Sequence, residues 1–240
     1  MKKIISILLG ICLCGGVFAQ TQLKIISFNI HAGYDAPIAD IAAFIKEQDP
    51  DIVALQEVEY YTNRTGANTP RPINNNINML NELAYLTGMH GMFYVTLEKC
   101  YGGKFGNAIL SKHSFDETRR IMLPCAAGIA DIKLPDGTEF SIVDTHIDMS
   151  KLDNGMSQIK EVNRIPQLGK HYIVAGDMNR RVGTAEINEL SSVWTLALSR
   201  ELDHIGYYPA NGWVVKETKV FSDNQLSDHY PIMVTLEFVK

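Results

Sequence analysis

Five short segments of this 240-residue chain end an apolar run in carboxylates, amides or histidines. They are Ser27-Phe28-Asn29, Leu55-Gln56-Glu57, Asp144-Thr145-His146-Ile147-Asp148, Gly176-Asp177-Met178-Asn179 and Ser227-Asp228-His229. A buried strand that ends in a charged group costs free energy unless the charge meets water, a partner or a metal ion. One such end is ordinary, but five that converge indicate a functional site.

The side chains in these segments favour a hard divalent cation. Carboxylate and amide oxygens dominate, and the chain has neither a cysteine cluster nor a His-x-x-x-His pair. We therefore expect Mg²⁺, with Mn²⁺ or Ca²⁺ as alternatives, rather than a structural zinc ion. Asp177 and Asn179 lie two residues apart and would project to the same side of an extended segment. A phosphate suits this set, because a cation, an amide and a water-binding carboxylate together can drive displacement at phosphorus.

Apolar runs that predict strands position these segments. Strands are expected over residues 23–30, 51–56, 92–97, 107–111, 139–145 and 172–175. Residues 38–48 carry apolar side chains at helical spacing and predict a helix that ends at Asp49-Pro50. A second helix is expected over residues 76–87, ended by Gly88. The first strand, the first helix and the second strand would form a βαβ unit.

The order of these elements predicts a layered α/β architecture. Many strands alternate with few helices, and Asp136-Gly137 predicts a hairpin turn between residues 130–134 and 139–143. We expect two mixed sheets that pack face to face with helices outside. The polar segments would then gather at the strand ends.

The composition is that of a folded domain. Apolar residues make up 46% of the chain and charged residues 20%, which excludes a disordered, collagenous or coiled-coil protein. No linker-like stretch, charge block or repeat divides the chain, so a single domain over residues 20–240 is expected. The formal net charge of −5 argues against a broad basic surface for nucleic acid.

Residues 1–19 are typical of a secretory signal peptide. Two lysines precede an apolar run over residues 4–14, and Val17-Phe18-Ala19 is a small-residue cleavage site. Cleavage after Ala19 would release the protein to the periplasm or the exterior and remove two lysines and no acid, which makes the charge −7. A retained anchor is the alternative, although a span needs roughly 20 apolar residues. Lipidation at Cys12 or Cys14 is a lesser alternative, because neither follows a small-residue pattern.

Two cysteines remain after such cleavage, Cys100 and Cys125. In an oxidising compartment they could form one disulfide, or they could stay as two buried thiols. The sequence leaves both alternatives open. Neither cysteine has an adjacent histidine that would indicate a thiol nucleophile.

Seven motifs together resemble the endonuclease/exonuclease/phosphatase family in content and order. They are residues 26–30, 51–57, 106–111, 144–148, 176–179, 202–205 and 227–231. The resemblance covers residues 23–240, nearly the whole mature chain. It implies a four-layer α/β/β/α sandwich of the DNase I-like type and an enzyme that hydrolyses phosphoric esters with Mg²⁺.

The resemblance also implies roles in metal and water binding. Glu57 is the expected principal metal ligand, with Asn29 and Asp228 beside it. Asp177 would orient or deprotonate the attacking water, and Asn179 would hold a phosphoryl oxygen. A plain Asx turn is the alternative for the last two residues.

The remaining matches imply proton handling and substrate contact. His229 resembles the catalytic histidine of the family, with Asp203 as the carboxylate that makes it a better proton acceptor. His146 would donate to the phosphate or the leaving group, although a histidine at a strand end is often only a hydrogen-bonded structural residue. Asn107 and Asp148 are expected to contact substrate, and a hairpin asparagine is the alternative for Asn107. His31, beside the first motif, receives no role.

The leading functional interpretation is a secreted or periplasmic phosphodiesterase that acts on a small or lipid-derived phosphodiester. A DNA endonuclease or exonuclease is the first alternative, weakened because a polyanion usually recruits several lysines and arginines. A phosphomonoesterase is the second. A non-catalytic binding module is remote, because the metal acid, the water-orienting acid and the histidine are all present. No protein partner is inferred, and no stable membrane insertion is expected after cleavage.

Overall fold

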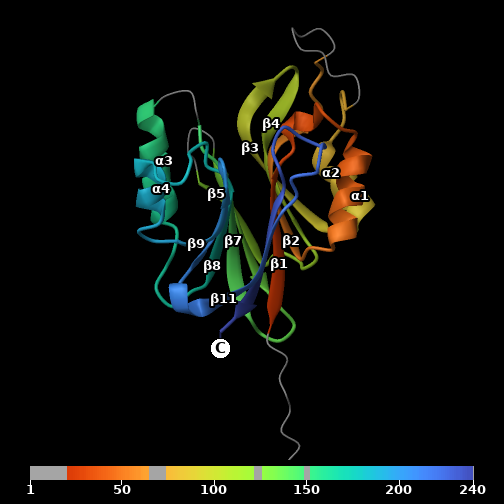
Figure 1. Cartoon of the computed structure of the whole chain (residues 1–240). Helices are drawn as coiled ribbons and strands as arrows, with labels where there is room; N and C mark the ends of the chain where they lie inside the picture. Colours follow the sequence, from red (N-terminus) through yellow and green to blue (C-terminus); the bar gives the residue numbers. More distant parts are fainter. Residues whose placement is uncertain (1–20, 65–73, 122–125, 149–151, 240) are drawn as a thin grey trace, which may run out of the picture.

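Two six-stranded β-sheets form the centre of the computed structural model, which describes residues 21–64, 74–121, 126–148 and 152–239 (Figure 1). Sheet A comprises β1 (Gln22–Asn29), β2 (Ile52–Tyr60), β3 (His90–Cys100), β4 (Gly103–Ser111), β11 (Trp213–Val220) and β12 (Ile232–Phe238). Sheet B comprises β5 (Glu117–Ile121), β6 (Ala127–Lys133), β7 (Glu139–His146), β8 (Tyr172–Asp177), β9 (Thr195–Arg200) and β10 (Asp203–Tyr208). The strand orders are β11-β12-β1-β2-β4-β3 and β5-β6-β7-β8-β10-β9.

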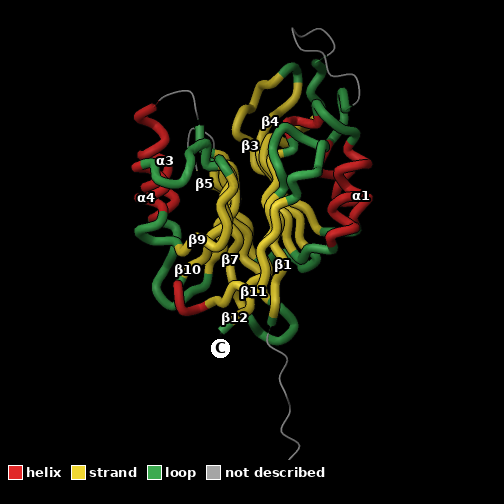
Figure 2. The backbone as a smooth tube through the Cα atoms, in the orientation of Figure 1, coloured by secondary structure: helices red, strands yellow, loops and turns green. Residues whose placement is uncertain are grey.

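Helices cover the outer face of each sheet. The first pair, α1 (Ile38–Gln48) and α2 (Met79–Thr87), lies on sheet A, and the second pair, α3 (Leu152–Asn163) and α4 (Ala185–Leu190), lies on sheet B. Figure 2 shows the helices outside and the strands between them. Two short 3₁₀ turns, η1 (His31–Gly33) and η2 (Ala210–Gly212), complete the described elements. The four-layer α/β/β/α sandwich expected from the sequence is confirmed.

The alternation of side chains along β1 shows how the layers are held together. Ile25 packs between the two sheets, whereas Ile26 and Phe28 pack on the opposite face beneath the helices. All three are fully buried. Because both faces of this strand are covered, its sequence is a continuous apolar run rather than an alternating one.

The predicted βαβ unit is present, with one boundary shifted. β1 pairs in parallel with β2, and α1 has the bounds that the sequence predicted. The second helix begins at Met79 rather than at residue 76, because the Asn78 side chain accepts a hydrogen bond from the Asn81 amide and caps the helix there. It ends as expected at Gly88, whose φ is 72°.

Several sequence-based predictions fall outside the described residues. They concern the signal peptide over residues 1–19 and Cys125, so the cleavage site and the disulfide stay predictions. Cys100 ends β3, and its sulfur lies 3.8 Å from Arg64 Nη2. Among the described residues, no helix combines the length and apolar character needed to cross a bilayer.

Candidate active site

The strand ends that carry the polar motifs meet at one edge of the sandwich. β1 and β2 run in parallel in sheet A, and β7 and β8 run in parallel in sheet B, so each pair ends on the same side. β10 runs antiparallel to β8, which places the start of β10 at the same edge, with Asp203 opposite Asp177. Topology therefore brings together side chains that are as much as 200 residues apart in the chain.

An amide from sheet A links the two carboxylates at the centre of the site. Asn29 Nδ2 donates to Glu57 Oε1 at 3.0 Å and to Asp177 Oδ2 at 3.1 Å. Asn29 is fully buried and Asp177 is 1% exposed. The three residues come from β1, β2 and β8, so this contact bridges both sheets and confirms the geometric convergence predicted from the strand ends.

A bulge in β2 turns Glu57 toward this amide. The pairing of β2 with β4 shifts between Leu55 and Val58, so two residues of β2 lie opposite one residue of β4. Glu57 takes a left-handed backbone conformation with φ of 57°, which is uncommon for a residue with a side chain. Such strain persists only where surrounding contacts hold it, and it concentrates at functional sites.

A histidine held by a buried acid faces the same carboxylate. His229 Nδ1 lies 2.8 Å from Asp203 Oδ2, and His229 Nε2 lies 3.7 Å from Asp177 Oδ2. The pairing of His229 with Asp203 that the sequence predicted is therefore present. The Ser227 hydroxyl donates to the Asn29 carbonyl at 2.7 Å and ties the loop that carries His229 to the end of β1.

The charges around His229 favour its protonated form. Burial alone would lower the pKa of His229, but the hydrogen bond and the charge of Asp203, with other nearby carboxylates, raise it to about 9. Burial also raises the pKa of Asp203, against the opposing effect of the hydrogen bond from His229. An imidazolium beside a phosphate would stabilise the negative charge that develops during displacement.

His146 approaches Asp177 from another direction. Its Nε2 lies 3.6 Å from Asp177 Oδ2, so the same carboxylate oxygen is flanked by two imidazoles. Asn179 completes the loop after β8: its main-chain amide donates to Asp177 Oδ1 at 2.8 Å, as in an Asx turn, and its side-chain Nδ2 donates to the Ile147 carbonyl at 2.7 Å. The Asx turn that the sequence offered as the alternative for Asp177 and Asn179 is therefore present. The contact of the Asn179 side chain with a phosphoryl oxygen stays a prediction.

Three other predicted residues lie at the edge of this cluster or inside the sandwich. Asp228 is half exposed, and its Oδ1 lies 3.5 Å from His31 Nδ1. Asn107 is fully buried in β4 opposite Tyr94, where neither side-chain polar atom has a hydrogen-bond partner. The main-chain amide of Asp148 donates to Gln158 Oε1 at 3.3 Å. The predicted contacts of Asn107 and Asp148 with substrate stay predictions.

Arg200 is a basic side chain beside the site that sequence reasoning did not identify. It lines a small cavity of about 150 Å³ together with Asp203, Asp228 and His229. Its guanidinium carbon lies 5.5 Å from the centre of the Tyr230 ring, and its Nε atom is buried without a hydrogen-bond partner. Arg200 ends β9 and belongs to none of the sequence motifs. Its position beside the site follows from the pairing of β9 with β10, which places Arg200 opposite Asp203.

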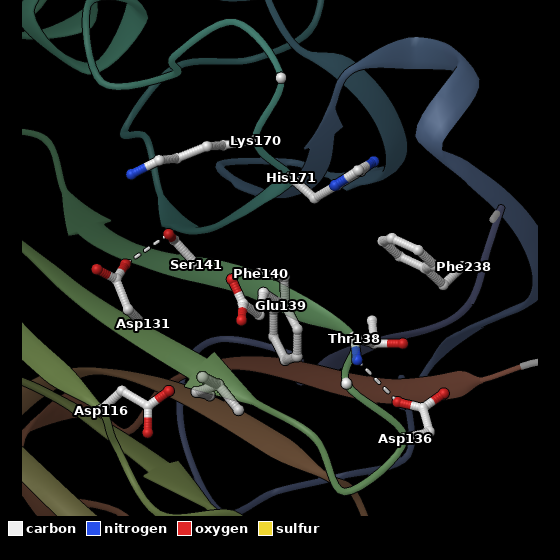
Figure 3. Close-up of a pocket in the computed structure, with 13 residues that line it drawn as sticks. Asp116, Asp131, Asp136, Thr138, Glu139, Phe140, Ser141, Lys170, His171 and Phe238 are labelled. Carbon is white, nitrogen blue, oxygen red and sulfur yellow. Dashed lines mark hydrogen bonds between the residues drawn. The ribbon is translucent and has the colours of Figure 1, made fainter.

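A larger cavity lies at the opposite end of the sandwich. It measures about 560 Å³ and is lined by the beginning of β7, including Phe140, whereas His146 at the end of β7 belongs to the polar cluster (Figure 3). Lys170, His171 and Phe238 form another part of its wall. Volume alone therefore does not locate the candidate active site.

The central cluster fits a divalent cation. Glu57 and Asp177 share one neutral amide, and neither is ion-paired with a lysine or arginine of the described residues. Two carboxylates with an amide oxygen nearby are hard oxygen ligands of the kind that Mg²⁺ and Mn²⁺ bind. Glu57 and Asn29 are the residues that would hold the ion beside Asp177, and bound there it would polarise a phosphoryl oxygen and offset developing charge.

Comparisons with known proteins identify the family and the fold. Residues 26–229 match the model of the Endonuclease/Exonuclease/phosphatase family. A search of curated proteins finds no match. A family protein from Beutenbergia cavernae superposes with a TM-score of 0.72 at 20% identity, covering 90% of this chain and 72% of that one.

Two further solved structures carry names that state an activity or a bound group. The mannosyl-6-phosphatase Bt3783 of Bacteroides thetaiotaomicron superposes with a TM-score of 0.68 at 17% identity, covering 90% of this chain and 100% of that one. The human Nocturnin catalytic domain, with bound sulfate, gives 0.68 at 19% identity, covering 92% and 97%. At these identities the likeness establishes the shared fold.

Proposed function

Because this chain belongs to the endonuclease/exonuclease/phosphatase family of metal-dependent phosphoester hydrolases, we propose that it is an exported Mg²⁺-dependent phosphodiesterase. The observation that carries the proposal is the buried Asp177 carboxylate, joined through Asn29 to Glu57 and flanked by the Nε2 atoms of His146 and His229. An acid, a metal ligand and two potential proton donors thus converge where a phosphate would lie.

In the proposed reaction water attacks phosphorus in line with the leaving oxygen. Asp177 orients the water and accepts its proton as the new P–O bond forms. His229, kept protonated by Asp203, stabilises charge on a phosphoryl oxygen. The bond from phosphorus to the leaving oxygen breaks, and His146 donates a proton to that oxygen. Arg200, whose Nη2 also lies 3.4 Å from Glu201 Oε1, would contact a further anionic oxygen at the rim.

A chelator experiment tests the metal-dependent step. Release of nitrophenol from bis(4-nitrophenyl) phosphate would be followed with Mg²⁺ or Mn²⁺ and with excess chelator. We expect release with the metal and almost none with the chelator, restored when metal is added back. Equal rates with and without chelator would exclude the metal-dependent mechanism.

The substrate class needs a matched panel. The mature chain is acidic, which favours a small or lipid-derived phosphodiester over DNA, because DNA binding draws on several basic contacts. A phosphodiester, the corresponding phosphomonoester and duplex DNA would be compared at equal phosphate concentration, with Asp177→Asn as the blank. Preference for the monoester or for DNA would replace the phosphodiesterase assignment with a phosphomonoesterase or a nuclease.

We also propose that residues 1–19 direct export and are removed after Ala19. The support is the basic, apolar and small-residue order of this segment. Mass spectrometry of the protein from a periplasmic or secreted fraction should give the mass of residues 20–240. A lipid adduct at a cysteine, or an intact first segment in the membrane fraction, would contradict cleavage at this position.

A further inference from the structure

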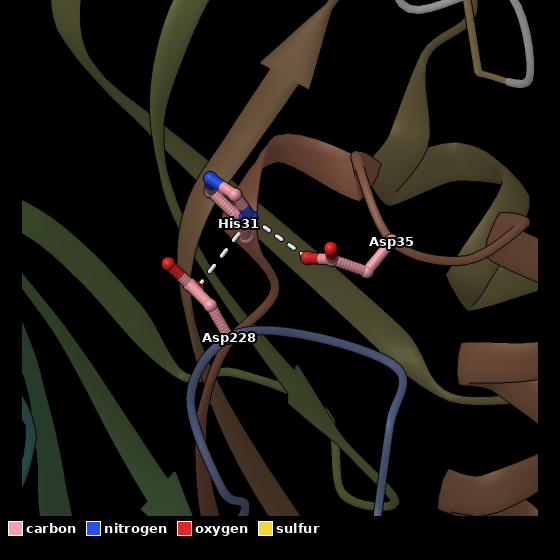
Figure 4. A group of neighbouring side chains, drawn as sticks. All are labelled: His31, Asp35 and Asp228. Carbon is pink, nitrogen blue, oxygen red and sulfur yellow. Dashed lines mark hydrogen bonds and ion pairs between the residues drawn. The ribbon is translucent and has the colours of Figure 1, made fainter.

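We propose a second divalent-cation site at the rim of the active site, formed by His31, Asp35 and Asp228 and selective for a transition metal such as Zn²⁺. The sequence suggested no role for His31 or Asp35, and it placed Asp228 with Glu57. The structure groups Asp228 with His31 and Asp35, and the ligand atoms of the three residues all lie within 4.8 Å of one another (Figure 4).

The spacing of the three side chains suits one ion. His31 Nδ1 faces both carboxylates, at 2.7 Å from Asp35 Oδ2 and 3.5 Å from Asp228 Oδ1. Ligand atoms at about 2.0–2.2 Å from an ion lie about 2.8–3.6 Å apart in octahedral or tetrahedral geometry. Small side-chain rotations would therefore let an ion replace the proton between the imidazole and the carboxylates.

The local charge also favours a cation. Within the described part of the chain, His31 is the only ion-pairing partner within 4.0 Å of either Asp35 or Asp228. Two carboxylates thus share a single imidazole, so acidic groups outnumber basic ones at this site. All three side chains are about one-third to one-half exposed, so an ion can enter from solvent.

The backbone holds His31 in place for this role. His31 begins η1 in a left-handed conformation, with φ of 47°. Its main-chain amide donates to Asn29 Oδ1 at 3.0 Å, which links its position to the residue at the centre of the active site. Asp228 directly precedes His229, so an ion at the rim would lie beside the catalytic histidine.

The ligand set points to a transition metal rather than to Mg²⁺. Imidazole nitrogen suits Zn²⁺, Cu²⁺ and Ni²⁺, whereas Mg²⁺ prefers carboxylates and water. Three protein ligands leave at least one position open for water or a phosphate oxygen, as in catalytic zinc sites. The buried group of Asp177, Asp203 and His229 belongs to the active site already described, so it is not a separate site.

Zinc titration of the mature protein in excess Mg²⁺ tests the proposal without measuring catalysis. Mg²⁺ saturates the oxygen site, and isothermal calorimetry then reports the remaining Zn²⁺ affinity. We expect one zinc ion per chain, bound at least about tenfold more weakly in His31→Asn and in Asp35→Asn. Asparagine suits the substitution at position 31 because it tolerates a left-handed backbone. Equal melting temperatures would show that both variants are folded.

Three matched variants locate the ion. His90→Asn removes an exposed histidine at the start of β3 and should leave zinc affinity unchanged. Glu57→Gln and His229→Ala should retain the zinc ion, because neither side chain belongs to the rim site. Parent-like affinity in His31→Asn, no zinc binding by the parent, or loss of zinc in Glu57→Gln or His229→Ala would overturn the proposal. Because these outcomes measure zinc rather than turnover, they are independent of the phosphodiesterase assignment.

Discussion

At the scale of single residues, the proposed mechanism assigns different tasks to two acids that accept hydrogen bonds from the same amide. Glu57 is turned inward by a bulge near the surface, whereas Asp177 is buried between two imidazoles. A higher metal concentration can compensate in part for the weaker metal affinity that follows the loss of a ligand. It cannot compensate for the loss of a proton acceptor. The two acids can therefore be separated by how their variants respond to Mg²⁺.

Asp177→Asn should reduce turnover by at least about a hundredfold, which is the lower end of the range for loss of general-base catalysis. Substrate affinity should change little. Glu57→Gln should also lose activity but recover part of it as Mg²⁺ rises, because it lacks only one ligand. Activity would be measured against Mg²⁺ for both purified variants, with melting temperature as the control for folding. Recovery of Asp177→Asn at high Mg²⁺ would assign that residue to metal binding.

The hydrogen-bonded pair Asp203 and His229 should behave as one unit. His229→Ala and Asp203→Asn should each lower turnover, and the double variant should be barely slower than His229→Ala, because the acid then has nothing to orient. Turnover of the four proteins under identical conditions measures the coupling. Losses that multiply would show that the two residues act independently.

At the scale of elements, the site depends on how closely β7 and β8 approach. A Cβ atom added at Gly176 would lie 1.9 Å from the Thr145 carbonyl oxygen, a contact with rigid backbone. The φ of Gly176, 154°, is also one that residues with side chains rarely adopt. Gly176 thus permits the pairing that places Asp177 next to His146.

Gly176→Ala should destabilise the protein by several kcal/mol, because it combines a clash with an unfavourable backbone conformation. Gly183→Ala is the matched control, since Gly183 has φ of 92° but nothing within 4 Å of the added Cβ. That substitution should lower the free energy of unfolding by only about 1–2 kcal/mol, because only the left-handed backbone is unfavourable for alanine there. Urea denaturation of both variants measures the difference, and equal losses would show that the clash with Thr145 is relieved.

At the scale of the whole molecule, polar contacts cross the apolar interface between the sheets near the site. Gln56 of sheet A donates to Asp144 Oδ1 of sheet B at 2.7 Å, and the Tyr94 hydroxyl donates to the Asp144 carbonyl at 2.8 Å. Asp144 is fully buried, and burial raises its pKa to about 8 despite these hydrogen bonds. The folded protein therefore keeps this carboxyl protonated at neutral pH.

This burial predicts a pH-dependent stability. In the unfolded chain Asp144 releases its proton near pH 4, but in the fold only near pH 8, so the unfolded state binds fewer protons between these values. The contribution of Asp144 to the free energy of unfolding is fully present below about pH 4 and is lost as the pH rises toward 8. The free energy of unfolding should fall by no more than about 1.4 kcal/mol per pH unit from this group. The parent should lose stability relative to Asp144→Asn over this range.

Urea denaturation of both proteins at about pH 5, 6, 7 and 8 would measure this loss of stability. These values lie between the pKa of Asp144 in the unfolded chain and its pKa in the fold. Because other groups titrate equally in both, the difference between the two free energies of unfolding isolates Asp144. A difference that stays constant with pH would show that the carboxyl is ionised in the fold.

The sequence alone predicted the layers, the βαβ unit and the chemical type of the site, because those features depend on local patterns. Apolar runs that end in Asn29, Glu57 and Asp177 are visible without coordinates. Some strands were not predicted: β11, for example, exposes most of its side chains at the edge of sheet A and has no alternating pattern.

Only the tertiary structure decided which polar residues meet. The bulge at Glu57 and the antiparallel return of β10 set the contacts of Asn29, Asp203 and His229, and both depend on strand pairing between distant segments. The same holds for Asp228, whose loop brings it to His31. Local sequence determines that a strand ends in a carboxylate, whereas register and packing determine which groups that carboxylate faces.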